Sequence, residues 1–77
     1  MNPPVISVKA QENYSLALEF ENGEKGTFSM LPYLQYPVYA PLKDVELFRK
    51  AHVVFGFVSW TDDIDMSPDN LYLEATK

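Results

Sequence analysis

The chain has 77 residues, a formal net charge of −5, 47% apolar residues and no cysteine. A chain of this length is expected to form one domain, residues 1–77. The lack of cysteine excludes disulfides and thiolate metal sites. No apolar run approaches the roughly 20 residues that cross a bilayer, and the first residues lack the basic and apolar regions of a signal peptide. We therefore expect a cytoplasmic protein with no membrane contact.

The charge distribution disfavours a nucleic-acid surface. Binding to phosphates requires several lysines or arginines that converge, and the chain has six in total. Lys43, Arg49 and Lys50 fall close together, but Asp44 and Glu46 lie among them. We therefore expect no direct nucleic-acid binding by this domain alone.

The first 30 residues predict a three-stranded antiparallel meander. Apolar residues alternate with more polar ones in residues 5–10, 14–20 and 25–30, as in strands with one buried face. Asn22-Gly23 separates the last two segments and is a strong hairpin signal, because both residues tolerate positive φ. The residues expected on buried faces are Ile6, Val8, Ala10, Tyr14, Leu16, Leu18, Phe20, Phe28 and Met30.

The second half predicts two short helices around a second hairpin. Residues 42–50 read as a two-turn helix with Asp44 as its N-cap. Residues 52–60 read as a hairpin with a tight turn at Gly56, and Ser67 followed by Pro68 begins a final helix. The predicted fold is α+β: a small, mostly antiparallel sheet in the order β-β-β-α-β-β-α, with the two short helices on one face.

The motifs along the chain resemble the bacterial domain-of-unknown-function family DUF2442. The resemblance covers nearly the whole chain, and its most specific part runs from Trp60 to Tyr72. It implies a regulatory or partner-binding role, because members resemble small stand-alone proteins or domains attached to helix-turn-helix modules. Some members are suspected partners in toxin–antitoxin-like gene pairs. The matching residues are Tyr14, Leu16, Leu18, Phe20, Asn22, Gly23, Glu24, Leu42, Lys43, Asp44, Phe48, Trp60, Asp63, Ile64, Ser67, Pro68, Asp69, Leu71 and Tyr72.

The sequence contains no recognisable catalytic set. His52 is the only histidine, and no serine lies in a G-x-S-x-G nucleophile elbow. The three glycines are isolated, so no phosphate-binding loop is present. We expect neither enzymatic activity nor a cofactor.

An acidic segment supports an alternative function. Asp63, Asp65, Ser67 and Asp69 alternate, and Glu74 is twelfth when Asp63 is counted first, which resembles the ligand spacing of a calcium loop. The sixth position, normally glycine, is Pro68, which cannot adopt positive φ. Capping of the last helix is the preferred interpretation, so no metal site is predicted. A small-ligand or divalent-ion sensor that uses Asp63 to Asp69 is the alternative.

Residues 31–41, here called the Tyr–Pro loop, contain three tyrosines and three prolines. Tyrosine is frequent at interfaces because it combines a large contact area with a polar tip. We therefore take Tyr33, Tyr36 and Tyr39, together with Trp60, as candidate partner-binding residues. The preferred interpretation for Leu31, Leu34 and Leu42 is that this loop covers the sheet and that these residues enter the core. Trp60 is also expected mainly in the core, with partner contact as the alternative, and for Tyr36 and Tyr39 the two interpretations stay open.

The expected function is thus a non-catalytic regulatory or partner-binding domain, adaptor-like or antitoxin-like, that contacts another protein. A small sheet leaves an edge strand exposed, so a homodimer is also compatible with the sequence.

Overall fold

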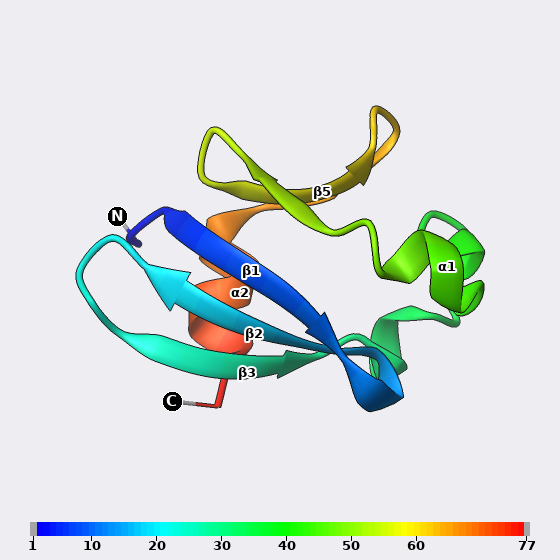
Figure 1. Ribbon diagram of the computed structural model, residues 1–77, viewed down its shortest axis with the longest axis horizontal. Coiled ribbons are helices and arrows are strands. Elements are labelled where there is room, and N and C mark those ends of the chain that lie inside the picture. Colours follow the sequence, from blue (N-terminus) through cyan, green and yellow to red (C-terminus); the bar gives the residue numbers. More distant parts are fainter. Residues whose placement is uncertain (1, 77) are drawn as a thin grey trace.

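The computed structural model describes residues 2–76, which form two antiparallel sheets of three strands each (Figure 1). The predicted α+β class is confirmed, and the order of elements broadly matches the predicted order. None of the helices in residues 2–76 is long and apolar enough to cross a membrane. The first sheet contains β1 (Val5–Gln11), β2 (Ser15–Phe20) and β3 (Lys25–Ser29); the second contains β4 (His52–Val54), β5 (Phe57–Thr61) and β6 (Ile64–Met66); the helices are α1 (Val45–Phe48) and α2 (Pro68–Glu74); short 3-10 turns span Glu12–Tyr14, Leu31–Tyr33 and Ala40–Lys43.

The first sheet is the predicted meander, with β2 at its centre. The alternation in β2 is confirmed, since Leu16, Leu18 and Phe20 are all buried. The prediction for Ile6 is wrong: its side chain is 52% exposed and Val5 is buried instead. The register explains this difference. Val5 pairs with Phe20 and Ser7 pairs with Glu19, so Ile6 is the extra residue of a β-bulge, which changes the side chains that face inward.

The two hairpin turns fall where the sequence predicts them. Between β2 and β3, Gly23 has φ +90° and the Asn22 side chain accepts a hydrogen bond from the Glu24 amide at 3.0 Å. Between β4 and β5, the two turn residues Phe55 and Gly56 have φ +49° and +84°. Positive φ at both central residues is the pattern of a type I′ turn.

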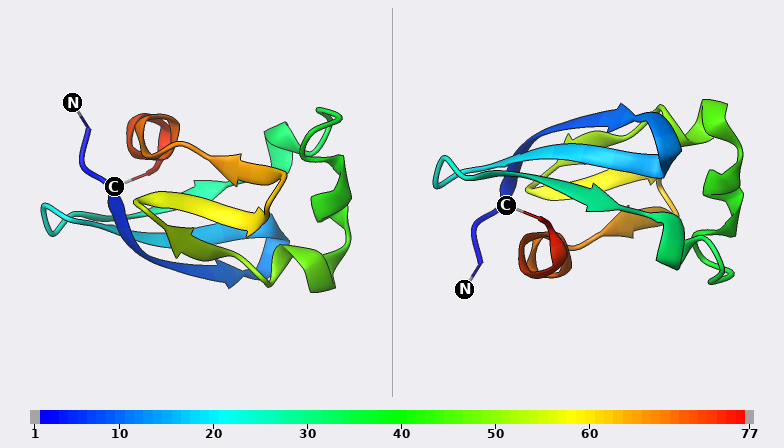
Figure 2. Two further views of the ribbon diagram at one scale, coloured as in Figure 1. Left: turned by 90° about the horizontal axis from the view of Figure 1, so that it is seen from above. Right: turned by 90° about the horizontal axis from the view of Figure 1, so that it is seen from below.

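The second sheet, rather than a pair of helices, covers one face of the first sheet. Views from above and below show the two sheets as layers, with α1 beyond one end of both and α2 near the other end, to one side (Figure 2). The core lies between the layers and includes Leu16, Leu18, Phe20 and Phe28 from the first sheet and Val58, Trp60, Ile64 and Met66 from the second.

The expectation of one sheet with both helices on one face is therefore corrected. The helix α1 spans four residues rather than the predicted two turns, which is too short to cover a sheet. It closes the end of the layers through Phe48, which contacts Tyr14 edge-on at 5.2 Å. Its predicted N-cap is confirmed, because the Asp44 carboxylate accepts from the Glu46 amide at 3.0 Å.

The helix α2 packs at the opposite end of the first sheet. The ring of Tyr72 meets Phe20 edge-on at 5.0 Å, and Leu71 is fully buried. After the helix, Thr76 exchanges two backbone hydrogen bonds with Thr27 of β3. This short bridge covers part of the β3 edge, which would otherwise be open to strand pairing.

Candidate functional site

The Tyr–Pro loop lies against the second sheet and α2 through two of its three tyrosines. Tyr33 packs against Phe28 with ring centroids 5.4 Å apart, and its hydroxyl accepts a hydrogen bond from the Asn70 side chain at 3.3 Å. Tyr39 donates from its hydroxyl to the backbone carbonyl of Asp65 in β6 at 3.1 Å. Burial, with Asp65 and Tyr33 nearby, raises the pKa of Tyr39 above its ordinary value. These two side chains hold the loop in place as a lid.

The outward side chains of the Tyr–Pro loop are Leu31, Tyr36 and Val38, each about half exposed. The placement of Leu31 in the core is wrong, whereas Leu34 and Leu42 are buried as expected. Tyr36 still touches Tyr33, with ring centroids 6.2 Å apart. Of the three candidate tyrosines, Tyr36 therefore presents the most surface to a partner, and its role in binding stays a prediction.

Trp60 is a core residue in this structure, as the preferred interpretation has it. Only 3% of its surface is exposed. Its ring stacks on Phe48 at 6.3 Å, and its indole N–H donates to the Phe48 carbonyl at 3.1 Å. A tryptophan whose polar atom is satisfied inside the protein has little surface left to offer a partner.

Polar and apolar residues alternate in the acidic segment, Asp63 to Asp69, because this segment contains strand β6. Ile64 and Met66 of β6 point inward and are buried, so Asp65 between them faces outward. Ser67 caps α2 by accepting from the Asp69 amide at 3.1 Å, as predicted. Residues 2–76 contain no group of three or more histidines, cysteines or carboxylates that could hold a metal ion. The strand β6 and the N-cap of α2 thus explain the spacing of Asp63, Asp65, Ser67 and Asp69 that suggested an ion sensor.

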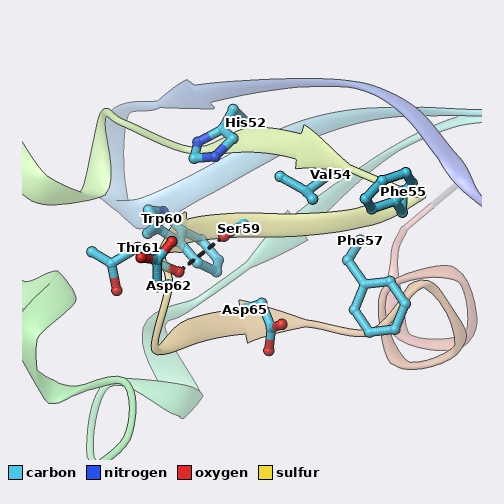
Figure 3. Close-up of a pocket in the computed structure, with 9 residues that line it drawn as sticks. All are labelled: His52, Val54, Phe55, Phe57, Ser59, Trp60, Thr61, Asp62 and Asp65. Atoms are coloured by element: carbon cyan, nitrogen blue, oxygen red, sulfur yellow. Dashed lines mark hydrogen bonds between the residues drawn. The ribbon is translucent and has the colours of Figure 1, made fainter.

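A groove with a volume of about 510 Å³ lies on the outward face of the second sheet and is here called the outer groove. Its volume lies within the range of small-ligand sites. Figure 3 shows apolar side chains at the hairpin end, His52 and Asp62 toward the other end, and Asp65 facing the groove from β6. The lining residues are His52, Val54, Phe55, Phe57, Ser59, Trp60, Thr61, Asp62 and Asp65.

Phe55 is the most unusual residue of the outer groove. It is 98% exposed at the tip of the β4–β5 hairpin, and its φ of +49° is an uncommon conformation for a bulky side chain. The turn itself is held firmly, because the Gly56 carbonyl accepts a hydrogen bond from the Val5 amide at 3.0 Å. The hairpin therefore presents an apolar ring on a fixed platform.

His52 and Ser59 also line the outer groove and form a cross-strand pair. A serine nucleophile would have to donate its proton to such a histidine. Here the Ser59 hydroxyl donates to the Thr61 carbonyl at 3.0 Å instead. The Nδ1 atom of His52 lies 2.8 Å from the Lys50 carbonyl, to which it can only donate. The Ser59 hydroxyl is thus directed at the Thr61 carbonyl and not at His52.

Sequence reasoning missed the outer groove, although two signals were available. Phe55 occupies a turn position at which asparagine or aspartate commonly precedes glycine. A second signal is the run from Phe55 to Val58, which places apolar residues on both faces of a short strand. Val58 points into the core, so the neighbouring Phe57 points outward and its apolar ring does not serve the core.

These features define a small two-sheet α+β module with a helix at each end and an apolar-rimmed groove on one outer face. The chain belongs to the family described as "Protein of unknown function (DUF2442)", whose sequence model matches residues 5–77. This confirms the resemblance seen in the sequence. No curated protein matches the chain.

The fold is similar to that of a solved structure, the "Putative DNA Binding Protein NE0471" from Nitrosomonas europaea. The two are 30% identical, with a TM-score of 0.84. The similarity covers 95% of this chain and 48% of the other protein, so this chain spans about half of that protein's length.

Proposed function

We propose that this chain is a non-catalytic protein-binding module with a regulatory role of the adaptor or antitoxin-like kind. The observation that carries this proposal is Phe55, a fully exposed phenylalanine held at positive φ beside a groove. Neither burial nor backbone preference favours phenylalanine at this position. Strained residues gather at functional sites, where the strain serves a purpose other than stability.

The surroundings of Phe55 are those of an interface. Val54 and Phe57 flank it on neighbouring strands and are exposed as well. Binding energy at protein interfaces concentrates in a few aromatic side chains next to well-formed pockets. Tyr36 on the Tyr–Pro loop supplies a second, smaller candidate contact, as the sequence suggested.

The name of the similar protein suggests DNA binding by that protein, whereas the charge of this chain opposes direct DNA binding. The net charge is −5. Of the three clustered cations near α1, Arg49 lies 3.7 Å from the Glu46 carboxylate, which offsets its charge.

A capture experiment from native extract tests the proposal. The full chain, Phe55→Asn and Tyr36→Ala serve as tagged baits, and bound proteins are identified by mass spectrometry. Val45→Ala is the matched control, because Val45 is an exposed apolar residue on α1 outside the outer groove. We expect one stoichiometric protein with the full chain and the control that is lost with Phe55→Asn.

Reconstitution from the two purified proteins must then reproduce the complex. Loss with Tyr36→Ala but not Phe55→Asn would move the interface to the Tyr–Pro loop. A gel-shift assay with duplex DNA runs in parallel at about 50 and 200 mM salt, because phosphate binding weakens steeply over that range. Salt-sensitive binding of DNA by the chain alone, with no captured protein, would overturn the proposal.

A further inference from the structure

We infer that the outer groove recognises a cationic side chain, arginine or lysine, on the surface of the partner protein. This inference rests on the proposed function and specifies the chemistry of the partner. The groove combines apolar side chains at the hairpin end with carboxylates farther along the sheet (Figure 3). Arginine and lysine combine the same two properties, an apolar stem and a charged head.

The carboxylates of the groove lack partners of their own. Asp62 and Asp65 both line it, and no lysine or arginine does. Among residues 2–76, the side-chain hydrogen bonds and ion pairs include none that engages either carboxylate, and the single ion pair joins Arg49 and Glu46 on α1. A cation from outside would therefore meet two free acceptors.

The apolar part of the groove suits the stem and plane of the same side chain. Phe57 and Val54 form a cross-strand pair whose side chains both face outward. A guanidinium or ammonium group is attracted to the face of an aromatic ring, and arginine also stacks on it. Phe55 at the rim adds an exposed ring for an apolar neighbour of the cation.

The partner engages the groove through side chains rather than by adding a strand. The second sheet has two edge strands, β4, which lies next to β1, and β6. The backbone carbonyl of Asp65 in β6 already accepts the hydroxyl of Tyr39 from the Tyr–Pro loop. The loop thus occupies a position that an added strand would need.

Other occupants fit the charges less well. A second copy of the chain would bring another −5 of net charge, and a symmetric contact across the groove would oppose four aspartates. Nucleic acid meets the same repulsion. A metal ion lacks the group of three ligands that would hold it, within the described residues.

Titration of the ¹⁵N-labelled full chain with short peptides tests this inference by NMR. The probe is an acetylated, amidated leucine–arginine–leucine tripeptide; the comparison probes carry glutamine or glutamate in place of arginine. We expect amide shifts at His52, Ser59 and Asp65 with the arginine probe. Glutamine and glutamate probes should bind progressively more weakly. Equal shifts with all probes, shifts elsewhere, or none at millimolar concentration would overturn the inference.

Variants that neutralise one groove carboxylate at a time test whether Asp62 and Asp65 bind the cation. Asp62→Asn and Asp65→Asn should each weaken the arginine probe about two- to five-fold, the range for exposed ion pairs. Asp63→Asn is the control, because Asp63 is exposed but does not line the groove. If Asp63→Asn weakens binding as much, long-range charge and not the groove is responsible, and the inference fails.

The same variants separate this inference from the proposed function. If the captured partner is lost with Phe55→Asn but retained with both aspartate variants, the binding module stands and the cationic contact is wrong. Sedimentation of the purified chain tests whether a second copy of the chain occupies the groove. A dimer that is abolished by Phe55→Asn would assign the groove to that second copy and overturn the inference.

Discussion

Replacing Phe55 with asparagine should make the protein more stable while abolishing binding. Phe55 and Gly56 form a two-residue turn with φ of +49° and +84°, and asparagine followed by glycine is the preferred pair for such a turn. The left-handed conformation costs an ordinary side chain about 1–2 kcal/mol, and asparagine escapes part of that cost through local hydrogen bonds. The substitution therefore relieves strain.

Little stability is lost in exchange, because the Phe55 side chain is 98% exposed. Almost no apolar area returns to water when the ring is removed. We expect the free energy of unfolding to rise by about 0.5–1 kcal/mol. For a domain of this size, 1 kcal/mol corresponds to a change in Tm of roughly 4–8 °C.

Urea unfolding followed by fluorescence measures this change, since the buried Trp60 is the only tryptophan. Phe55→Ala is the control: it removes the same ring but keeps a side chain that is disfavoured at positive φ, so its stability should stay close to that of the original chain. If Phe55→Asn is less stable than the original, or if both variants shift equally, strain at Phe55 does not explain the behaviour of the turn.

Three further substitutions test the fold around the groove. Gly56→Ala should destabilise the protein by about 1–3 kcal/mol in urea unfolding, because φ is +84° and the new Cβ would lie 2.7 Å from the Cβ of Pro4; a neutral effect would mean that the hairpin is not pinned to β1. Ser67→Ala should cost about 1 kcal/mol by removing the N-cap of α2, and an unchanged Tm would contradict this. The raised pKa of Tyr39 means that the folded state keeps its proton longer than the unfolded chain, so this stabilisation is present below the ordinary pKa of 10.0 and is lost as pH rises above it. Tyr39→Phe should lower stability near neutral pH by about 1 kcal/mol, but the variant should lose less stability than the original chain as pH rises above 10.0; identical alkaline profiles would refute the assignment.

The sequence predicted those parts of the fold that depend on local pattern. Alternation along β2, the two hairpin turns and the caps at Asp44 and Ser67 all follow from the residues within a few positions. The bulge at Ile6 did not, because a bulge is set by the register between two strands.

The other differences between the predicted and the observed structure also arise from contacts between segments, which no local pattern shows. The strand β6 spans only Ile64–Met66 and is stabilised by pairing with β5, so its short alternation reads equally well as a loop of acidic ligands. Packing against the first sheet decides which face of the second sheet turns outward and carries the outer groove, and no local pattern specifies this packing. Of the candidate residues named from the sequence, Trp60 lies in the core and at the wall of the groove, and Tyr36 faces outward.

The two outer faces of this fold differ in a way that favours the second sheet as the binding surface. On the first sheet, Glu19 pairs across the strands with Lys25, and Lys9 and Thr27 are exposed nearby. Such a face of opposite charges and hydroxyls is well solvated and supported by cross-strand pairs. The second sheet instead presents Phe57 outward. The first sheet exposes one large apolar side chain, Ile6 at its bulge, whereas the second exposes Val54, Phe55 and Phe57 together. Because a contiguous apolar patch is more informative than a single exposed residue, this clustering favours a function on the face of the second sheet.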